Sequence, residues 1–307
     1  MSSKRVRVTV PSSTANLGPG FDTLGMALQL YSVVEMQVSE QTTIELIGKE
    51  LQGTPTDKSN LLYVIAAELF QQAGLAVPEL HIRASSEAPL TRGLGSSAAA
   101  IVGALVAANH LAGEPFTRDQ LFAMAVKKEG HPDNVGPSFF GGIIVATMPE
   151  KENQPIPYIR LAPPAAMRAL VVIPDYALST EKARNALPQV YSKKDVIYNV
   201  GHSSLLVAAL AQGRLDLLGQ AMGDRLHQPY RAPLVPGLEE ILAAATDNGA
   251  VGAALSGAGP TILCLTASDS ECERLKSFVD QVMRGHGISY QTMVLQPDEH
   301  GVQVEVQ

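Results

Sequence analysis

The feature that most constrains this chain is a glycine-rich loop that runs directly into a stretch of small residues. Residues 89–99 read Pro-Leu-Thr-Arg-Gly-Leu-Gly-Ser-Ser-Ala-Ala, and an apolar, Ala-rich stretch continues to Leu111. This pattern predicts a helix from about Ser97, with one of the two serines as its N-cap. Gly93 and Gly95 lack a Cβ, so their backbone N–H groups can approach a ligand closely. Together with the positive end of the helix dipole, the loop is suited to bind the phosphates of a nucleotide.

Two better-known phosphate-binding motifs fit this loop poorly. Gly95 is followed by Ser96, so the lysine of a Walker A motif is missing. The spacing Gly93-x-Gly95-x-x-Ala98 matches a dinucleotide-binding fingerprint, but no acidic residue ends a strand about twenty residues later. The plain alternative is a capped helix after a flexible loop that binds nothing.

The rest of the chain predicts a mixture of strands and helices in two domains, because 307 residues exceed one ordinary core. Val6, Val8 and Val10 alternate with polar residues as a strand that Pro11 would end. The alternating run from 28 to 38 predicts a second strand, and residues 44–46 a hairpin partner for it. Helices are expected after Asn60 or Ser59, either of which can be the N-cap, and after the capping box formed by Thr117 and Gln120.

The second half shows the order β-α-α-β-β-α-β, which is typical of a split βαβ sheet with helices on one face. Residues 149–157 carry three prolines and alternating charge, and they suit either a linker or a long hairpin. We therefore expect an N-terminal domain over 1–155, which carries the phosphate loop, and a C-terminal domain over 156–307.

Composition limits the partners. The net charge of -7 and the pI near 5.5 argue against nucleic-acid and anionic-membrane partners. The doubled lysines at 127–128 and 193–194 are interpreted as solvated helix faces. Cys264 and Cys272 lack a metal-binding spacing, so reduced thiols are expected. No apolar leader follows the N-terminal basic residues, and the chain is expected to be soluble and cytoplasmic.

Several stretches resemble one family. Residues 89–99 look like the phosphate-binding signature of the GHMP small-molecule kinases. "VPSSTANLGPGFDTLGMAL" (10–28) is similar to the opening motif of the homoserine kinase branch, and "GAALSGAGPTI" (252–262) to the third family motif. "EGHPDNVGPSFFGG" (129–142) and "GDRLHQPYR" (223–231) fit the same branch. The resemblance implies an α+β, two-domain GHMP kinase fold, with a ribosomal S5 domain 2-like N-terminal domain and a ferredoxin-like C-terminal domain.

The resemblance also implies a site. ATP is the co-substrate, and Ser97 and Glu129 would hold Mg²⁺. L-Homoserine is the substrate, and the family suggests a homodimer. The loop residues expected at ATP are Pro89, Leu90, Thr91, Arg92, Gly93, Leu94, Gly95, Ser96, Ser97, Ala98 and Ala99, with Asn60 at the adenine. The side chains expected at the amino acid are Asn16, Asp22, His131, Asn134, Arg184 and Arg231.

These side chains suit the chemistry of an amino acid. Asp22, with Asn16 near it, suits the ammonium group, and Arg184 and Arg231 suit the carboxylate, which a guanidinium binds with two hydrogen bonds. His131 and Asn134 would orient the hydroxyl. Gly257 and Gly259 would let the third motif press on the phosphate loop or the γ-phosphate; the alternative is a tight β-turn that the hairpin itself requires.

Three points stay open. Asn134 and Asp133 are the candidate catalytic residues; Asp133 is either a general base or dispensable, with the γ-phosphate accepting the proton. The alternatives to a homoserine kinase are a GHMP kinase for another small hydroxy or amino acid and a non-catalytic ligand-binding member. Taken alone, Arg184 could be a surface residue paired with Glu181.

Overall fold

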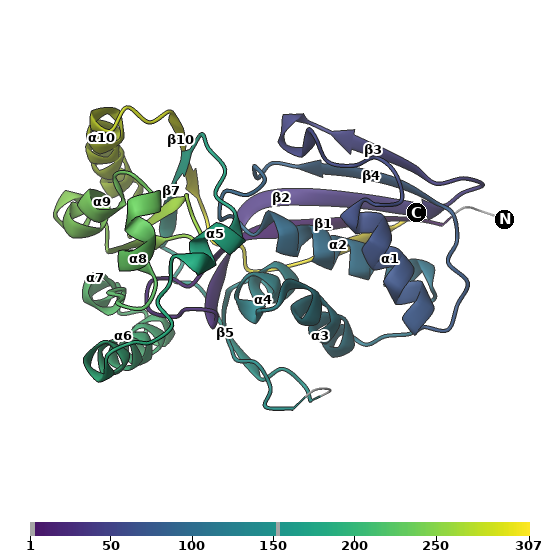
Figure 1. Ribbon diagram of the computed structural model, residues 1–307, viewed down its shortest axis with the longest axis horizontal. Coiled ribbons are helices and arrows are strands. Elements are labelled where there is room, and N and C mark those ends of the chain that lie inside the picture. The colour runs from purple at the N-terminus through teal and green to yellow at the C-terminus, as the bar shows by residue number, and fades with distance from the viewer. Residues whose placement is uncertain (1–3, 152–153) are drawn as a thin grey trace.

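A computed structural model describes residues 4–151 and 154–307, and it shows two neighbouring α+β units (Figure 1). In the first unit, four helices cover one face of a large sheet. Its strands are β1 (Arg5–Ala15), β2 (Leu24–Val38), β3 (Thr43–Ile47), β4 (Leu80–Ser86), β5 (Ile143–Ala146) and β6 (Tyr158–Leu161). Its helices are α1 (Leu61–Gln72), α2 (Ser96–Leu111), α3 (Arg118–Glu129) and α4 (Pro132–Phe140), with a short 3₁₀ turn η1 (Lys49–Leu51).

The second unit has a four-stranded antiparallel sheet with the order β10-β7-β9-β8. Its strands are β7 (Arg168–Pro174), β8 (Gly252–Leu255), β9 (Ile262–Thr266) and β10 (Tyr290–Leu295). Its helices are α5 (Thr180–Asn185), α6 (Lys193–Ala211), α7 (Leu218–Ala221), α8 (Gln228–Arg231), α9 (Leu238–Ala244) and α10 (Asp269–Gly285), with 3₁₀ turns at Leu215–Leu217, Ala232–Leu234 and Thr246–Asn248. This strand order agrees with the split βαβ arrangement expected from the sequence.

The structure corrects two expectations about the first strands. β1 does not end at Pro11; a change of register between Pro11 and Ser12 lets it continue to Ala15. β3 is not a hairpin partner of β2. It pairs in parallel with β4, with Ile44 opposite Ile82, because β4 occupies the edge of β2 that a hairpin would need.

β5 and β6, which flank the segment 149–157, pair antiparallel as a hairpin. The last strand, β11 (Gln303–Val306), returns to the first sheet and pairs with β1. The first sheet therefore has seven strands and takes strands from both ends of the described chain. The division at residue 155 stays a prediction.

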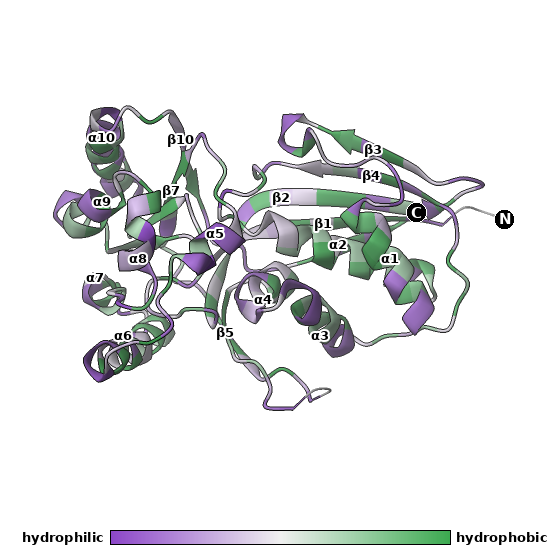
Figure 2. Cartoon of the chain, in the orientation of Figure 1, coloured by the Kyte–Doolittle hydropathy of each residue, from purple (hydrophilic) through white to green (hydrophobic). Residues whose placement is uncertain are grey.

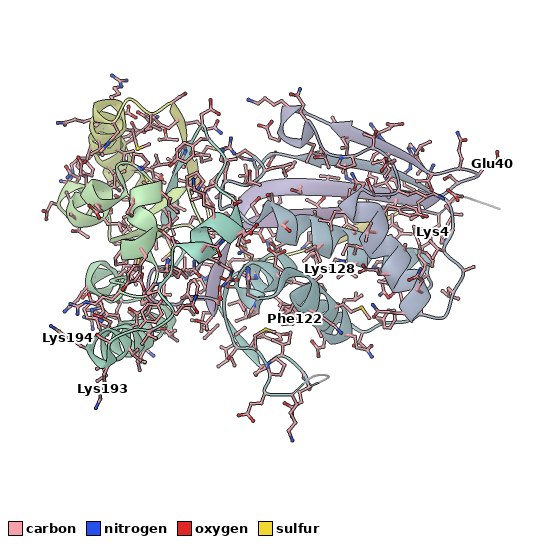
Figure 3. The ribbon with its side chains drawn as sticks, viewed as in Figure 1. Lys4, Glu40, Phe122, Lys128, Lys193 and Lys194 are labelled. Atoms are coloured by element: carbon pink, nitrogen blue, oxygen red, sulfur yellow. The ribbon has the colours of Figure 1, made fainter. Side chains whose placement is uncertain are left out.

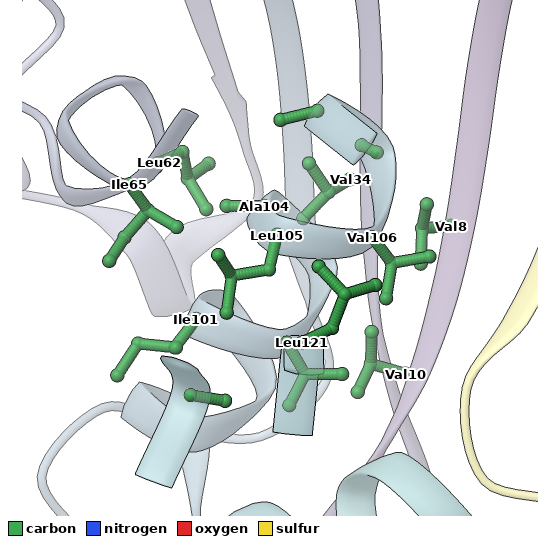
Figure 4. Close-up of a cluster of buried hydrophobic side chains, with 14 of the residues drawn as sticks. Val8, Val10, Val34, Leu62, Ile65, Ile101, Ala104, Leu105, Val106 and Leu121 are labelled. Atoms are coloured by element: carbon green, nitrogen blue, oxygen red, sulfur yellow. The ribbon is translucent and has the colours of Figure 1, made fainter. Parts of the chain in front are cut away.

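The core of the first unit explains why α2 is rich in small residues. Figure 4 shows Val8 and Val10 of the sheet beside Val106 of α2, while Ile101 and Leu105 of the same helix lie toward Leu62 and Ile65 of α1. A Cβ at Gly103 would lie 2.9 Å from Val34 Cγ2, so the helix lies directly on the strands. Figure 2 shows apolar residues along α2, which lies on the sheet, and along α1, which packs against α2. The loop before α2 is thus mounted on a rigid, buried helix.

The doubled lysines differ from each other. Lys193 and Lys194 point away from the protein at the start of α6 (Figure 3). Lys128 instead contacts Glu68 on α1, 2.7 Å between Nζ and Oε1, and lines the cavity described below. Both cysteines are free, as expected, and both are buried. None of the helices in the described part of the chain has the length and hydrophobicity that crossing a bilayer requires.

Candidate active site

The phosphate loop enters α2 through glycines in the left-handed region. Gly95 is the N-cap residue, with φ 66°, and no side chain caps the helix, so the serine cap expected from the sequence is wrong. Gly93 has φ 81°. A Cβ would lie 2.0 Å from Ser13 Oγ at Gly95 and 2.4 Å from the Ser256 carbonyl oxygen at Gly93. The loop needs glycine here for both conformation and space, and the first N–H groups of α2 have no side-chain acceptor.

Residues of the motifs at 10–28 and 252–262 form hydrogen bonds with this loop. Ser256 Oγ lies 2.5 Å from the Gly93 carbonyl oxygen and 2.8 Å from Thr14 Oγ1. The Ser13 backbone N–H donates to the Leu94 carbonyl at 3.2 Å. A Cβ at Gly257 would lie 3.6 Å from the Gly93 carbonyl oxygen, so the third motif presses on the loop. Residues far apart in sequence therefore fix the loop in one shape.

A cavity of about 390 Å³ opens beside the loop, and it gathers most of the residues expected from the sequence. All six expected substrate contacts line it, together with Asp133 and the two candidate metal ligands. The loop residues that line it are Thr91, Gly93, Gly95, Ser96 and Ser97.

The remaining expected ATP contacts lie elsewhere. Leu94, Ala98 and Ala99 point into the cores. Pro89, Leu90 and Arg92 line a second cavity of about 520 Å³. Asn60 caps α1: its side chain accepts from Leu62 N at 2.9 Å and donates to the Pro55 carbonyl at 2.5 Å. The Asn60 side chain thus has two hydrogen bonds within its own turn.

The two candidate metal ligands lie together at the start of α2. Ser97 Oγ donates to Glu129 Oε2 at 2.9 Å. Glu129 ends α3, and burial raises the pKa of its carboxyl, although the His131 charge and the Ser97 hydrogen bond act against this. Two oxygen donors side by side are the kind of ligands that Mg²⁺ prefers. The residues present therefore fit a magnesium ion, which Ser97 and Glu129 would hold.

The acidic side of the cavity is a strained loop between β1 and β2. Asn16 and Asp22 have φ of 72° and 55°, in the left-handed region. Asn16 Oδ1 accepts from Asp22 N at 3.0 Å, and its Nδ2 donates to the Gly257 carbonyl at 3.0 Å. Strained residues that their surroundings hold firmly cluster at functional sites.

Arg184 is not paired with Glu181 on its own helix. Its guanidinium forms a two-pronged ion pair with Asp22, at 3.0 and 2.9 Å. The neighbouring arginine, Arg231, is only 2% exposed. Burial and the charge of Arg184 lower the pKa of Arg231 to about 10. Phe21 lies against both guanidinium groups, 5.7 and 5.2 Å from its ring centre.

The third side of the cavity is the start of α4. His131 is the N-cap residue of this helix, and its Nδ1 forms a short contact with the buried Asp133 carboxylate. Burial alone would lower the pKa of His131, but the hydrogen bond to Asp133 and the nearby carboxylates raise it. Asn134 Oδ1 accepts from Ser13 Oγ at 3.0 Å. The first turn of α4 thus holds these side chains.

Sequence reasoning missed three contributors. Ser13 and Ser256 brace the phosphate loop, and His227 is fully buried beside Arg231. His227 stands in the quoted stretch 223–231, and a histidine four residues before a functional arginine on a short helix was the available signal.

Family models match both halves of the chain. The GHMP kinases N terminal domain matches residues 60–142, and the GHMP kinases C terminal domain matches residues 206–285. The chain belongs to the GHMP kinase family.

Within this family, the chain is similar to proteins named homoserine kinases. The homoserine kinase of Deinococcus radiodurans is 45% identical over 97% of this chain and 96% of its own length. That of Desulfitobacterium hafniense is 44% identical over 97% of this chain and 99% of its own. The crystal structure of homoserine kinase from Cytophaga hutchinsonii superposes with a TM-score of 0.86, at 27% identity, and covers 98% of this chain and 97% of that one.

Proposed function

We propose that this protein is a homoserine kinase. It transfers the γ-phosphoryl group of ATP to the terminal hydroxyl of L-homoserine and gives O-phospho-L-homoserine and ADP. The observation that carries the proposal is the wall of the cavity: a carboxylate, Asp22, and two guanidinium groups, Arg184 and Arg231, lie beside a loop suited to phosphate. The similarity to named homoserine kinases over nearly the whole chain supports it.

The charges of the cavity match a zwitterion. The substrate ammonium would contact Asp22 and Asn16, and its carboxylate would contact Arg184 and Arg231. Because Asp22 and Arg184 already pair with each other, a zwitterion replaces each partner without leaving a charge unpaired. A substrate with only one charge would leave one of them uncompensated, which disfavours its binding.

Phosphoryl transfer then depends on positioning and charge. The amide groups of the 93–97 loop receive the ATP phosphates at the positive end of α2. Ser97 and Glu129 would hold Mg²⁺, which neutralises phosphate charge when bound. His131 and Asn134 would orient the hydroxyl for in-line attack.

The proton of the hydroxyl has two candidate acceptors. Asp133 is buried and already contacts His131 Nδ1, so its charge is partly compensated in the free site. We favour the view that Asp133 orients His131 and that the γ-phosphate accepts the proton, and a substitution that separates these roles is given in the Discussion.

The test is a substrate panel in an ADP-release assay. L-Homoserine is compared with 4-hydroxybutyrate, which lacks the ammonium, with 3-amino-1-propanol, which lacks the carboxylate, and with mevalonate. We expect kcat/KM for L-homoserine to exceed the others by about 10- to 100-fold or more, since each lost charged contact costs about 1.5–3 kcal/mol. A preference for another compound would make the chain a different GHMP kinase, and ATP binding without turnover would make it a non-catalytic member.

We also propose that the enzyme is a homodimer and that it works in the cytoplasm. The homodimer is tested by the molar mass in solution, and the cytoplasmic location by fractionation of cells.

A further inference from the structure

His227 is the buried histidine that the reaction outlined above does not use. Its side chain is fully buried between the β1–β2 loop and α8. Nε2 lies 2.7 Å from the Gly18 carbonyl oxygen, and the ring stacks on Phe21 with centres 5.2 Å apart. Gly18 itself is tightly placed, because a Cβ there would lie 2.2 Å from the Met222 carbonyl oxygen. His227 therefore joins the loop that carries Asp22 to the second unit.

The contacts of the ring define its tautomer. A hydrogen bond to a carbonyl requires the proton on Nε2, which leaves a lone pair on Nδ1. That lone pair faces Arg231 Nη1 at 3.3 Å. The charged groups around the ring are Asp224, 3.6 Å from Nε2, Arg231 and, farther away, Asp22. Burial lowers the pKa of His227 in spite of Asp224, so the ring is neutral at pH 7 and Nδ1 is an acceptor.

Both carboxylate oxygens of Asp224 already accept hydrogen bonds. One of its oxygens accepts from Leu226 N and Asn199 Nδ2, and the other accepts from the backbone N–H groups of residues 227 and 228. Its carboxylate thus fixes the turn that leads into α8, and with it the position of the His227 ring.

His227 is one of three acceptors that orient the Arg231 guanidinium. Nε donates to the Ala183 carbonyl at 3.2 Å, and Nη1 donates to the Gly257 carbonyl at 3.0 Å as well as to His227. Within residues 4–151 and 154–307, Nη2 has no hydrogen bond, and Arg231 lines the cavity. The protein therefore fixes one side of the guanidinium and leaves the Nη2 protons for a ligand.

We infer that His227 is a positioning residue that sets the orientation of Arg231 toward the substrate carboxylate. The inference rests on the proposed function, because the carboxylate belongs to the amino-acid substrate. Two hydrogen bonds through one ring tie the two sides of the cavity, the Asp22 loop and Arg231, into a fixed spacing. That spacing is what a substrate with an ammonium and a carboxylate on one carbon requires.

Two substitutions separate the two hydrogen bonds of His227. In His227→Asn the amide oxygen can take the place of Nδ1 and accept from Arg231. In His227→Gln the longer amide can donate to Gly18 but holds no acceptor where Nδ1 stood. We expect kcat/KM for L-homoserine to fall about 10- to 100-fold in the Gln variant and less than ~10-fold in the Asn variant, as expected for an acceptor lost by a charged donor.

Three further measurements distinguish a role of His227 in positioning Arg231 from a role in stabilising the fold. The KM for ATP should stay within about twofold, and kcat/KM for 3-amino-1-propanol, which has no carboxylate, should be unchanged. In an Arg231→Met background, His227→Gln should have no further effect on L-homoserine binding measured by calorimetry. His202→Asn, a half-buried histidine on α6 outside the cavity lining, is the matched control.

These experiments separate failure of the role of His227 from failure of the proposed function. Equal losses for L-homoserine and 3-amino-1-propanol, or additive effects in the Arg231→Met background, would overturn the role of His227 while wild-type activity on L-homoserine still supports the proposed function. A wild-type enzyme without activity on L-homoserine would overturn both. Variants that melt like the wild type make the comparison independent of folding.

Discussion

Asp22 and Arg184, 162 residues apart in the sequence, bind each other across the cavity with two parallel hydrogen bonds. The sequence had indicated that these residues contact opposite ends of the substrate. In the structure they neutralise each other, and both side chains remain partly exposed, at 34% and 39%. The ion pair is therefore open to exchange with an incoming zwitterion.

Removing one partner of this pair should damage substrate binding. We expect Asp22→Asn to raise the KM for L-homoserine by about 10- to 100-fold, because the ammonium loses its counter-charge and Arg184 is left without one. Arg214→Gln is the control, since Arg214 forms a similar two-pronged pair with Asp216 on the surface. Steady-state kinetics with both substrates check this, and an unchanged KM for L-homoserine would exclude Asp22 from the site.

Ser97 and Glu129 should control the metal requirement. Ser97→Ala removes one oxygen donor and should lower kcat by ~10²-fold at low Mg²⁺, with partial recovery at high Mg²⁺. Glu68→Gln, which loses only the exposed contact with Lys128, is the control for a carboxylate near α3. A Mg²⁺ titration of initial rates shows the effect; identical titration curves for Ser97→Ala and wild type would contradict it.

The raised pKa of Glu129 gives the metal site a pH dependence. A raised pKa means that the carboxyl takes up a proton at a higher pH than an ordinary glutamate, whose pKa is about 4.3. The protonated form binds Mg²⁺ poorly. The half-saturating Mg²⁺ concentration should therefore rise as the pH falls toward the raised pKa of Glu129. Rates measured against free Mg²⁺ from pH 8 to about 5, corrected for the protonation of ATP, should show the rise, and a constant value would argue against Glu129 as a ligand.

Asp133→Asn separates a general base from an orienting residue. If the γ-phosphate accepts the proton, the amide can still contact His131 and at least about a tenth of wild-type kcat should remain. A loss of ~10³-fold or more, with unchanged KM values, would establish Asp133 as the base. Single-turnover measurements show whether the chemical step is the one affected.

The two glycines that flank α2 offer a matched pair of substitutions. Gly95→Ala places a Cβ 2.0 Å from Ser13 Oγ at φ 66°, whereas Gly113→Ala, at φ 86°, meets no atom within 4 Å. Gly113→Ala should cost only the backbone strain, about 1–2 kcal/mol. Gly95→Ala should cost more and abolish tight ATP binding. Thermal melts and ATP titrations measure the two effects; equal destabilisation would contradict the close packing of the loop.

The sequence could predict what depends on neighbours along the chain. Asn60 caps α1, and Thr117 with Gln120 forms the expected capping box of α3, because these hydrogen bonds join residues within one turn. The partner of β3 could not be predicted in this way. An alternating strand has the same pattern whether it pairs with β2 or with β4, and tertiary packing decides.

The same distinction holds for the cavity. The family motifs predicted that Asn16, Ser97 and Arg231 share one site, and all three line the cavity. The ion pair of Asp22 with Arg184 could not be predicted, because it joins two segments that meet only in the folded protein. His227 carries no periodic signal, because its role comes from a carbonyl 209 residues away.

The return of β11 to the edge of β1 also has a consequence for synthesis. The sheet beneath the phosphate loop gains this edge strand from residues 303–306, which pair with residues 6–9. A ribosome has therefore made almost every residue of both units before the platform under the nucleotide is complete. Until residues 303–306 have been made, a nascent chain holds an open strand edge at β1.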